Sequence, residues 1–208
     1  MKRGKFIAFE GGEGAGKSTQ VWYLQRALEA HGIDCVVTRE PGGTPGAEAI
    51  RALLLGTEGD GWHARAEALL FAAARSDHVE RKILPALDAG QWVICDRFVD
   101  SSRAYQGGAG GLSDADVMAL HQVGSQGLLP DLTVLIEVSP AIAAARASAR
   151  DGGAVDRIGG RDEAYHARVA AAFVQFADAE PARFARVNGD ATANEVAESV
   201  LSAIEPLL

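Results

Sequence analysis

The first feature of this 208-residue chain that could do chemistry is a glycine-rich loop near its N-terminus. An apolar run at residues 6–10 leads directly into residues 11–18, which read G-x-x-x-x-G-K-S. Glycines let successive backbone N–H groups face one anion, and a following helix adds the positive end of its dipole. In such loops the lysine, here Lys17, reaches the β- and γ-phosphates of a nucleoside triphosphate, while the hydroxyl of Ser18 ligates Mg²⁺. The strand-like run before the loop and the helix-like segment 19–30 after it favour phosphate binding over a chance turn.

Polar clusters follow two later apolar runs. Asp96 and Arg97 end the run at residues 92–95, and Arg39 and Glu40 follow the run at 34–38. An acidic side chain at the end of a strand suits the Mg²⁺ shell of a phosphate-binding loop, because this cation takes oxygen ligands. An arginine beside it can bind a second phosphate bidentately, although a surface ion pair is the plainer alternative. The sequence therefore predicts Ser18 and Asp96 as metal-site residues.

The elements that must position these residues form an alternating pattern. Five short apolar runs are separated by helix-length segments, and lie at residues 5–10, 34–38, 92–95, 131–138 and 184–187. Strands that alternate with helices predict parallel crossovers, whose ligands lie beyond the carboxyl ends of the strands. Residues 64–87 are expected to form one long helix that Pro85 kinks or interrupts. Two glycine-rich segments, 107–111 and 152–160, are predicted to be mobile loops.

Composition limits the class of protein. A chain of 208 residues with 48% apolar residues can bury one sizeable core, which predicts a single domain over residues 1–208. Its net charge of −8 argues against an extended nucleic-acid footprint. No apolar run is long enough for a signal peptide or a membrane span, so we expect a cytoplasmic protein. Cys35 and Cys95 lie inside apolar runs and are expected to be buried thiols rather than a disulfide or a metal site.

Several segments, in this order, resemble the bacterial thymidylate kinases, P-loop kinases that move the γ-phosphoryl group of ATP onto dTMP. The resemblance covers nearly the whole chain and rests on FEGGEGAGKST at 9–19, TREPGG at 38–43, EALLFAAAR at 67–75, DRFVDSSRAYQG at 96–107 and PDLTVLIEV at 130–138. It implies an α/β P-loop kinase fold: a five-stranded parallel sheet surrounded by helices. It also implies a homodimer packed through helices and a lid, approximately residues 146–163, that closes over ATP.

The resemblance also assigns binding residues. For ATP these are Gly11, Gly12, Glu13, Gly14, Ala15, Gly16, Lys17, Ser18 and Thr19. For dTMP they are Glu13, Arg39, Arg51, Phe71, Arg75, Arg97, Ser102, Tyr105 and Gln106. Phe71 would stack on thymine and Arg75 would bond a thymine carbonyl, their spacing of four placing both on one helix face. Without the resemblance, Phe71 reads as an ordinary core residue.

Further roles follow for the other side chains of this set. The three arginines Arg39, Arg51 and Arg97 would surround the dTMP phosphate, and Glu13 would face the 3′-hydroxyl of the sugar. Tyr105 would lie beneath the sugar, where its ring would exclude a 2′-hydroxyl. Glu40 reads either as a group that orders the metal shell or as a turn residue.

Catalysis of this kind needs alignment and charge neutralisation rather than a protein nucleophile. One branch of the family carries an arginine at the position of Gly14, so the charge here must come from elsewhere, and Gly14→Arg is expected to restore part of it. The resemblance assigns catalysis to Lys17, Arg97 and the lid arginines Arg150 and Arg157, ranked above Arg146 and Arg161. A family glutamate of the lid is replaced by Gly159, so its role is lost or taken by Glu163.

Two other functions remain open at this point. One is a kinase for another nucleoside monophosphate or for a deoxynucleoside. The other is an ATP-dependent switch, which is disfavoured because a second anion pocket with an aromatic platform for a base has no purpose there.

Overall fold

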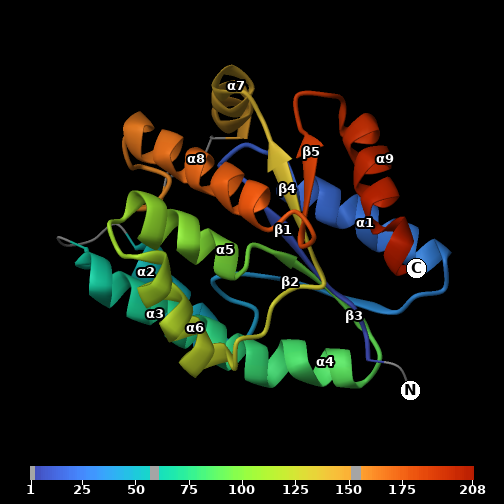
Figure 1. The fold of residues 1–208 in the computed structure, drawn as a ribbon, viewed down its shortest axis with the longest axis horizontal. Helices are drawn as coiled ribbons and strands as arrows, with labels where there is room; N and C mark the ends of the chain where they lie inside the picture. Colours follow the sequence, from blue (N-terminus) through green and yellow to red (C-terminus); the bar gives the residue numbers. More distant parts are fainter. Residues whose placement is uncertain (1–2, 57–60, 151–155) are drawn as a thin grey trace.

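The computed structural model describes residues 3–56, 61–150 and 156–208, without the side chains of residues 147–150. Its strands are β1 (Phe6–Glu10), β2 (Cys35–Arg39), β3 (Trp92–Asp96), β4 (Leu132–Glu137) and β5 (Phe184–Asn188). They form one parallel sheet in the order β2-β3-β1-β4-β5 (Figure 1). The predicted five-stranded parallel sheet is confirmed, and each strand boundary lies within one residue of the expected position.

Helices connect the strands. They are α1 (Lys17–Ala30), α2 (Pro45–Leu55), α3 (Ala64–His78), α4 (Leu84–Asp88), α5 (Val99–Ser102), α6 (Asp114–Ser125), α7 (Pro140–Arg150), α8 (Glu163–Ala179) and α9 (Ala193–Ile204). Two π-helical segments, η1 (Val79–Ile83) and η2 (Arg103–Ala109), and a short 3₁₀ helix, η3 (Glu205–Leu207), complete the chain. Local capping explains several boundaries. Thr192, for example, forms a reciprocal capping box with Glu195 at the start of α9.

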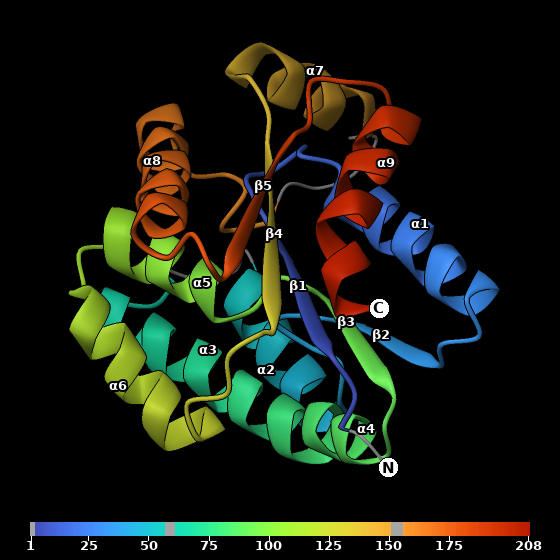
Figure 2. The ribbon, with the colours of Figure 1, turned by 45° about the vertical axis from the view of Figure 1, so that its right-hand side comes forward.

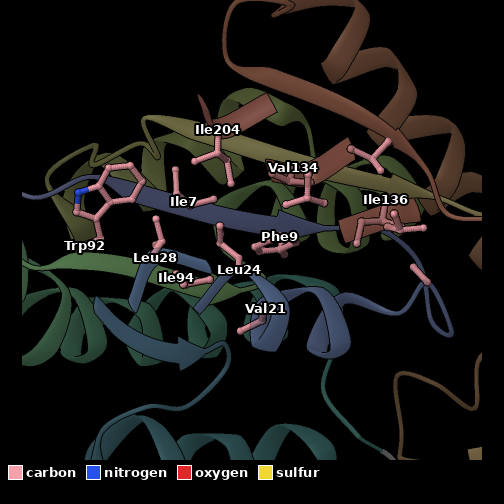
Figure 3. Close-up of a cluster of buried hydrophobic side chains, with 14 residues drawn as sticks. Ile7, Phe9, Val21, Leu24, Leu28, Trp92, Ile94, Val134, Ile136 and Ile204 are labelled. Carbon is pink, nitrogen blue, oxygen red and sulfur yellow. The ribbon is translucent and has the colours of Figure 1, made fainter. Parts of the chain in front are cut away.

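The strands are apolar on both faces because helices cover the sheet on both sides (Figures 1 and 2). Alternate residues such as Ile7 and Phe9 point toward α1 and α9, where they pack with Leu24, Leu28 and Ile204 (Figure 3). Their neighbours on the strands face the opposite way, toward the helices that follow α2. This second face is built from Phe6, Ala8, Val93 and Cys95 together with residues of η1, α4 and α5.

The expected long helix does run from residue 64 to residue 88, but with a π segment in its middle. Pro85 is the second residue of α4, and η1 precedes it. A proline lacks the N–H donor and its ring presses on the carbonyl one turn earlier, so a wider turn before it relieves the clash. The predicted interruption at Pro85 is therefore a change of helix type.

The first glycine-rich segment, 107–111, differs from the prediction of a mobile loop. Residues 107–109 belong to η2, and Gly107 is buried. A Cβ on Gly108 would lie 2.6 Å from the Cβ of Ala172 in α8. Glycine serves here as a site of close contact between η2 and α8, which composition alone does not distinguish from a loop.

The two cysteines are free thiols, as expected. Cys95 is buried in β3 and its thiol donates to the carbonyl of Arg97 at 3.0 Å, whereas Cys35 is only half-buried at the start of β2. Burial raises the pKa of both thiols, and nearby carboxylates add to the effect. Among the helices of the described residues, none is long and apolar enough to cross a membrane.

Candidate active site

The glycine-rich loop joins β1 to α1 at the carboxyl end of the central strand. Gly11, Gly14 and Gly16 adopt positive φ angles of 136°, 71° and 89°, which glycine accepts without strain. Lys17 bends back over the loop and donates from Nζ to the carbonyls of Gly11 at 3.1 Å and Gly12 at 2.9 Å. Burial lowers the pKa of Lys17 to about 8, and the charge of Arg97 adds to this shift. The ammonium group thus already lies over the loop expected to hold the phosphates.

The two predicted metal-site residues lie together. Ser18 Oγ donates to Asp96 Oδ2 at 2.8 Å, so both side-chain oxygens lie at the mouth of the loop. Mg²⁺ takes oxygen ligands and usually keeps several waters and substrate phosphates in its shell, so one hydroxyl and one carboxylate suit it. Within the described parts of the chain, no group of three or more His, Cys, Asp or Glu residues could hold a metal ion by itself.

Beside the loop lies a cavity of about 330 Å³. Its walls come from the ends of β2 and β3, from α2 and α3, and from α5 and η2. All nine side chains predicted to bind the monophosphate line it: Glu13, Arg39, Arg51, Phe71, Arg75, Arg97, Ser102, Tyr105 and Gln106. Ser18 and Asp96 line the same cavity at its loop end. Asp156 and Ile158 line it as well, so the fold brings together residues from position 13 to position 158 of the sequence.

Arg75 is buried in the wall of this cavity with its guanidinium already held. Its Nε donates to Glu40 Oε2 at 2.7 Å, and its Nη2 donates to Ser102 Oγ at 2.9 Å and to the carbonyl of Phe98 at 3.2 Å. Phe71 precedes it by one helical turn and lines the same cavity. The base platform and the arginine predicted to read the base thus share one face of α3.

Glu40, for which the sequence leaves open a role in the metal shell or in a turn, contacts two side chains of α3. Its buried carboxylate pairs with Arg75 and lies 3.0 Å from His78 Nδ1, and His78 Nε2 lies 2.7 Å from Thr38 Oγ1. Burial opposes ionisation of Glu40, but Arg75 and His78 hold its pKa below the usual value. The sequence interpretation missed His78, although it lies three residues after Arg75 on the same helix.

Arg97 lies between the glycine-rich loop and the cavity. It has a φ of 69°, unusual for a residue with a side chain, and its Nη2 donates to Glu13 Oε1 at 2.6 Å. Its Nη1 donates to the carbonyl of Gly11 at 3.1 Å, and the guanidinium lies 5.1 Å from the centre of the Tyr105 ring. One arginine therefore contacts both halves of the site.

The segment after β3 is fixed by Glu10, a residue that sequence interpretation did not single out. Its buried carboxyl accepts hydrogen bonds from the backbone N–H groups of Phe98 at 2.8 Å and Ser101 at 3.0 Å, and from Ser101 Oγ. Burial, reinforced by the charge of Asp100, raises the pKa of Glu10 to about 7. The last residue of β1 thereby holds the start of α5 against the sheet.

The other two arginines predicted to bind the phosphate lie at the rim of the cavity. Arg39 pairs with Glu48, and Arg51 Nη1 donates to the carbonyl of Pro41 at 2.7 Å. The backbone N–H of Gly43 also donates to Glu48, and together these bonds lower the pKa of that carboxyl. The TREPGG turn is thus tied to α2, which carries Arg51.

The arginines of the predicted lid differ in what they contact. Arg157 Nε donates to the carbonyl of Gly56 at 2.7 Å, just beyond α2. Arg146 reaches the other way, to the carbonyls of Gly189 at 2.9 Å and of Ala15 in the glycine-rich loop at 3.5 Å. Arg161 forms an ion pair with Glu67 of α3. The side chain of Arg150 lies outside the described residues.

The expected rescue by Gly14→Arg is incompatible with this structure. Gly14 has a φ of 71°, and a Cβ there would lie 2.6 Å from the carbonyl oxygen of Ala143 in α7. Any side chain at this position would need both an unfavourable backbone conformation and a shift of α7. Charge for the donor phosphates must therefore come from outside residues 11–16.

The fold and site define a class of protein. A glycine-rich loop at the central strand, a lysine and a serine at the start of α1, and an arginine-rich cavity beside them are the features of a P-loop kinase with a separate acceptor site. The thymidylate kinase family profile matches residues 9–200. The chain belongs to the thymidylate kinase family, which confirms the resemblance found in the sequence.

Individual relatives agree with this assignment. The chain is 54% identical over 205 residues to a thymidylate kinase of Rhizorhabdus wittichii, with 99% of each chain covered. It is 48% identical to a thymidylate kinase of Bradyrhizobium sp. (strain ORS 278), covering 99% of this chain and 92% of the relative. A crystal structure of thymidylate kinase from Ehrlichia chaffeensis is 30% identical and superposes with a TM-score of 0.79, covering 97% of this chain and 99% of that one.

Proposed function

We propose that the protein is a dTMP kinase, which transfers the γ-phosphoryl group of ATP to dTMP and gives dTDP and ADP. The observation that carries this proposal is the position of Arg97, which contacts the glycine-rich loop through Gly11 and lines the acceptor cavity. The reacting phosphates of donor and acceptor would meet at this guanidinium. Family membership and the names of the relatives favour dTMP over another monophosphate or a deoxynucleoside as acceptor.

The acceptor would lie with its base between Phe71 and Arg75 and with its phosphate toward Arg97. Arg39 and Arg51 would approach the phosphate from the rim, since bidentate guanidinium groups match phosphate geometry. Glu13 would face the 3′-hydroxyl, Tyr105 the sugar, and Ser102 and Gln106 the base. Arg75 is already bonded to Ser102, so we expect its remaining N–H groups to reach the thymine carbonyl.

Phosphoryl transfer in this site would depend on alignment and charge. An oxygen of the dTMP phosphate attacks the γ-phosphorus while the bond to the β-phosphate oxygen breaks, so the protein supplies no covalent group. Lys17 and Arg97 would balance charge from the loop side, and Arg150 and Arg157 from the lid. Ser18 and Asp96 fit a Mg²⁺ ion, which would neutralise phosphate charge there.

Other properties complete the proposal. We infer a single domain over residues 1–208 with a lid at 146–163, a cytoplasmic location, and no nucleic-acid partner. We also infer a homodimer, because α3 packs between α2 and α6 and each of these helices exposes a large apolar side chain. Leu53 and Leu69 are 55% exposed and Val123 is 87% exposed, a pattern that suits a partner surface. Light scattering of the purified protein, compared with a Leu69→Glu variant, would test the dimer.

A coupled assay of ADP release tests the activity itself. ATP would be supplied with each of dTMP, dUMP, dCMP, dAMP, dGMP and thymidine as acceptor, with and without Mg²⁺. We expect the highest kcat/KM with dTMP, and activity only when the divalent ion is present. Faster turnover of thymidine or of a purine monophosphate would contradict the proposal.

A further inference from the structure

A buried carboxylate that the reaction does not use lies behind the acceptor cavity. Glu67 is 4% exposed and precedes Phe71 by one turn of α3. Its Oε1 accepts a hydrogen bond from Gln106 Nε2 at 3.0 Å, and its Oε2 accepts one from Arg161 Nη2. A lid residue, an acidic residue of α3 and an amide that lines the cavity thus form one chain of hydrogen bonds.

The charge of Arg161 decides what Glu67 can do. Guanidinium remains protonated in proteins, and that of Arg161 forms an ion pair with the Glu67 carboxylate. An ionised carboxylate only accepts hydrogen bonds, so the group of Gln106 that faces Glu67 must be its NH₂. The orientation of this amide therefore follows from the hydrogen-bonding chemistry of Glu67.

A planar amide that turns its nitrogen toward Glu67 turns its oxygen away from it. Gln106 is 2% exposed and lines the acceptor cavity together with Arg75. The wall of the cavity then combines N–H donors from Arg75 with a carbonyl acceptor from Gln106. That combination matches a base edge on which a carbonyl adjoins a ring N–H, as in thymine and uracil. It does not match cytosine, where an amino donor stands beside an unprotonated ring nitrogen that accepts.

We propose that Glu67 and Arg161 are positioning residues that fix the Gln106 amide with its oxygen toward the base, and so exclude cytosine nucleotides. The inference rests on the proposed function, because it assumes that the base of a nucleoside monophosphate occupies this cavity. Arg161 has one further contact: its guanidinium lies 4.5 Å from the centre of the Tyr165 ring. Tyr165 is held in turn, because its hydroxyl donates to the carbonyl of Tyr105 at 2.7 Å. Selection of the base thereby depends on a residue of the lid.

The test compares dTMP with dCMP in Glu67→Gln. Two amides can pair in either orientation, so this variant lets Gln106 turn its NH₂ toward the base. We expect the ratio of kcat/KM for dTMP to that for dCMP to fall about tenfold or more, as one mismatched buried hydrogen bond is removed. Dissociation constants from titration calorimetry give the same ratio where turnover of dCMP is too slow to measure.

Arg161→Met and Arg161→Lys separate positioning from structural support. Arg161→Met removes the ion pair that orients Glu67, so the ratio of kcat/KM for dTMP to that for dCMP should fall in this variant as well. Arg161→Lys keeps the charge and should keep most of the discrimination. These variants also decide the question if Glu67→Gln fails to fold.

Two outcomes would count against different claims. If folded Glu67→Gln and Arg161→Met slow both nucleotides equally and leave the ratio unchanged, the positioning role is wrong while dTMP kinase activity stands. If the wild-type protein does not phosphorylate dTMP, the proposed function itself fails.

Discussion

The two halves of the site hold their functional groups in different ways. In the glycine-rich loop, the ammonium of Lys17 is bonded to carbonyls of its own loop, Gly11 and Gly12, which phosphate oxygens must replace as partners. In the acceptor cavity, each of three nitrogen-bearing side chains is held by a different carboxylate. The pairs are Arg75 with Glu40, Gln106 with Glu67, and Arg97 with Glu13.

This difference suggests that the acceptor site is organised before its substrate arrives, whereas the donor loop rearranges its contacts. Groups that are already oriented lose less entropy on binding, and their orientation sets which ligand fits. Substitutions in the loop should therefore change the rate and the use of ATP. Substitutions of the supporting carboxylates should change the affinity and choice of the acceptor.

The largest expected effect is on the donor side, in Lys17→Ala. We expect phosphoryl transfer to fall by about 10³ or more, because a cation that neutralises the transferring phosphates is lost. Titration calorimetry should still detect dTMP binding close to that of the wild type, since the acceptor cavity is built by other residues. Loss of dTMP binding in a folded variant would show that the two halves are not separable.

Substitution of the arginines of the proposed lid should give the next largest loss of activity. Arg150→Ala and Arg157→Ala are expected to lower kcat by about 10³ while the KM for dTMP changes only a few-fold, as for arginines that stabilise a transferring phosphoryl group. Steady-state kinetics with both substrates varied measures the split. Arg65→Ala, on the exposed side of α3, is the matched control. Near-normal kcat in both single variants and in the double variant would remove the lid from the chemistry.

On the acceptor side, Glu40→Gln tests the supporting carboxylates. Removing one partner of a buried ion pair leaves Arg75 poorly compensated, so the free energy of unfolding should fall by about 3 kcal/mol. The KM for dTMP should rise about tenfold, since a shift of roughly 1.4 kcal/mol in positioning Arg75 corresponds to that factor. Chemical denaturation and kinetics measure the two effects. The control is Glu29→Gln, which breaks the exposed pair with Arg26. It should change the free energy of unfolding and the KM for dTMP only slightly.

A smaller effect is expected on the discrimination between deoxyribose and ribose. Tyr105 is buried with its ring beside Arg97, and the resemblance places it beneath the sugar of the acceptor. Tyr105→Ala should narrow the gap in kcat/KM between dTMP and its ribose counterpart by about tenfold, mainly by admitting the ribonucleotide. If both nucleotides are slowed equally, Tyr105 supports packing and the sugar is selected elsewhere.

The smallest effect is a dependence on pH that should distinguish the two halves. With a pKa of about 8, Lys17 is charged below this value and loses its proton above it. The kcat/KM for ATP, which reports the free enzyme, should therefore fall only about twofold between pH 7 and pH 8 and decline further above it. The kcat/KM for dTMP at saturating ATP should decline less. A flat ATP profile up to pH 9.5 would contradict the role of burial at Lys17.

The donor half could be predicted almost completely from the sequence, because its parts are contiguous. A strand, a glycine-rich turn, Lys17 and Ser18 follow one another, and local spacing defines their geometry. The five strands could be predicted equally well, since each is a short apolar run. The lining of the acceptor cavity was predicted through the family resemblance rather than from spacing.

What could not be predicted is the set of groups behind the cavity wall. Glu67 meets Arg161 across 94 positions of sequence and Gln106 across 39, and Glu40 meets Arg75 across 35. Each partner is an ordinary charged or polar residue that a single sequence gives no reason to pair with another. Only helix packing against the sheet brings them together. The same packing turns residues 103–109, expected in part to be a loop, into a π-helix.

The unequal burial of the two thiols has a practical consequence for spectroscopy. Cys95 lies inside the sheet one residue before Asp96, whereas Cys35 is half-buried at the start of the edge strand β2, at the end of the sheet away from the active site. A maleimide dye or spin label should therefore attach to Cys35 first and leave the site intact. The native sequence thus offers one attachment point, and a second label introduced in residues 146–163 would test whether the proposed lid moves.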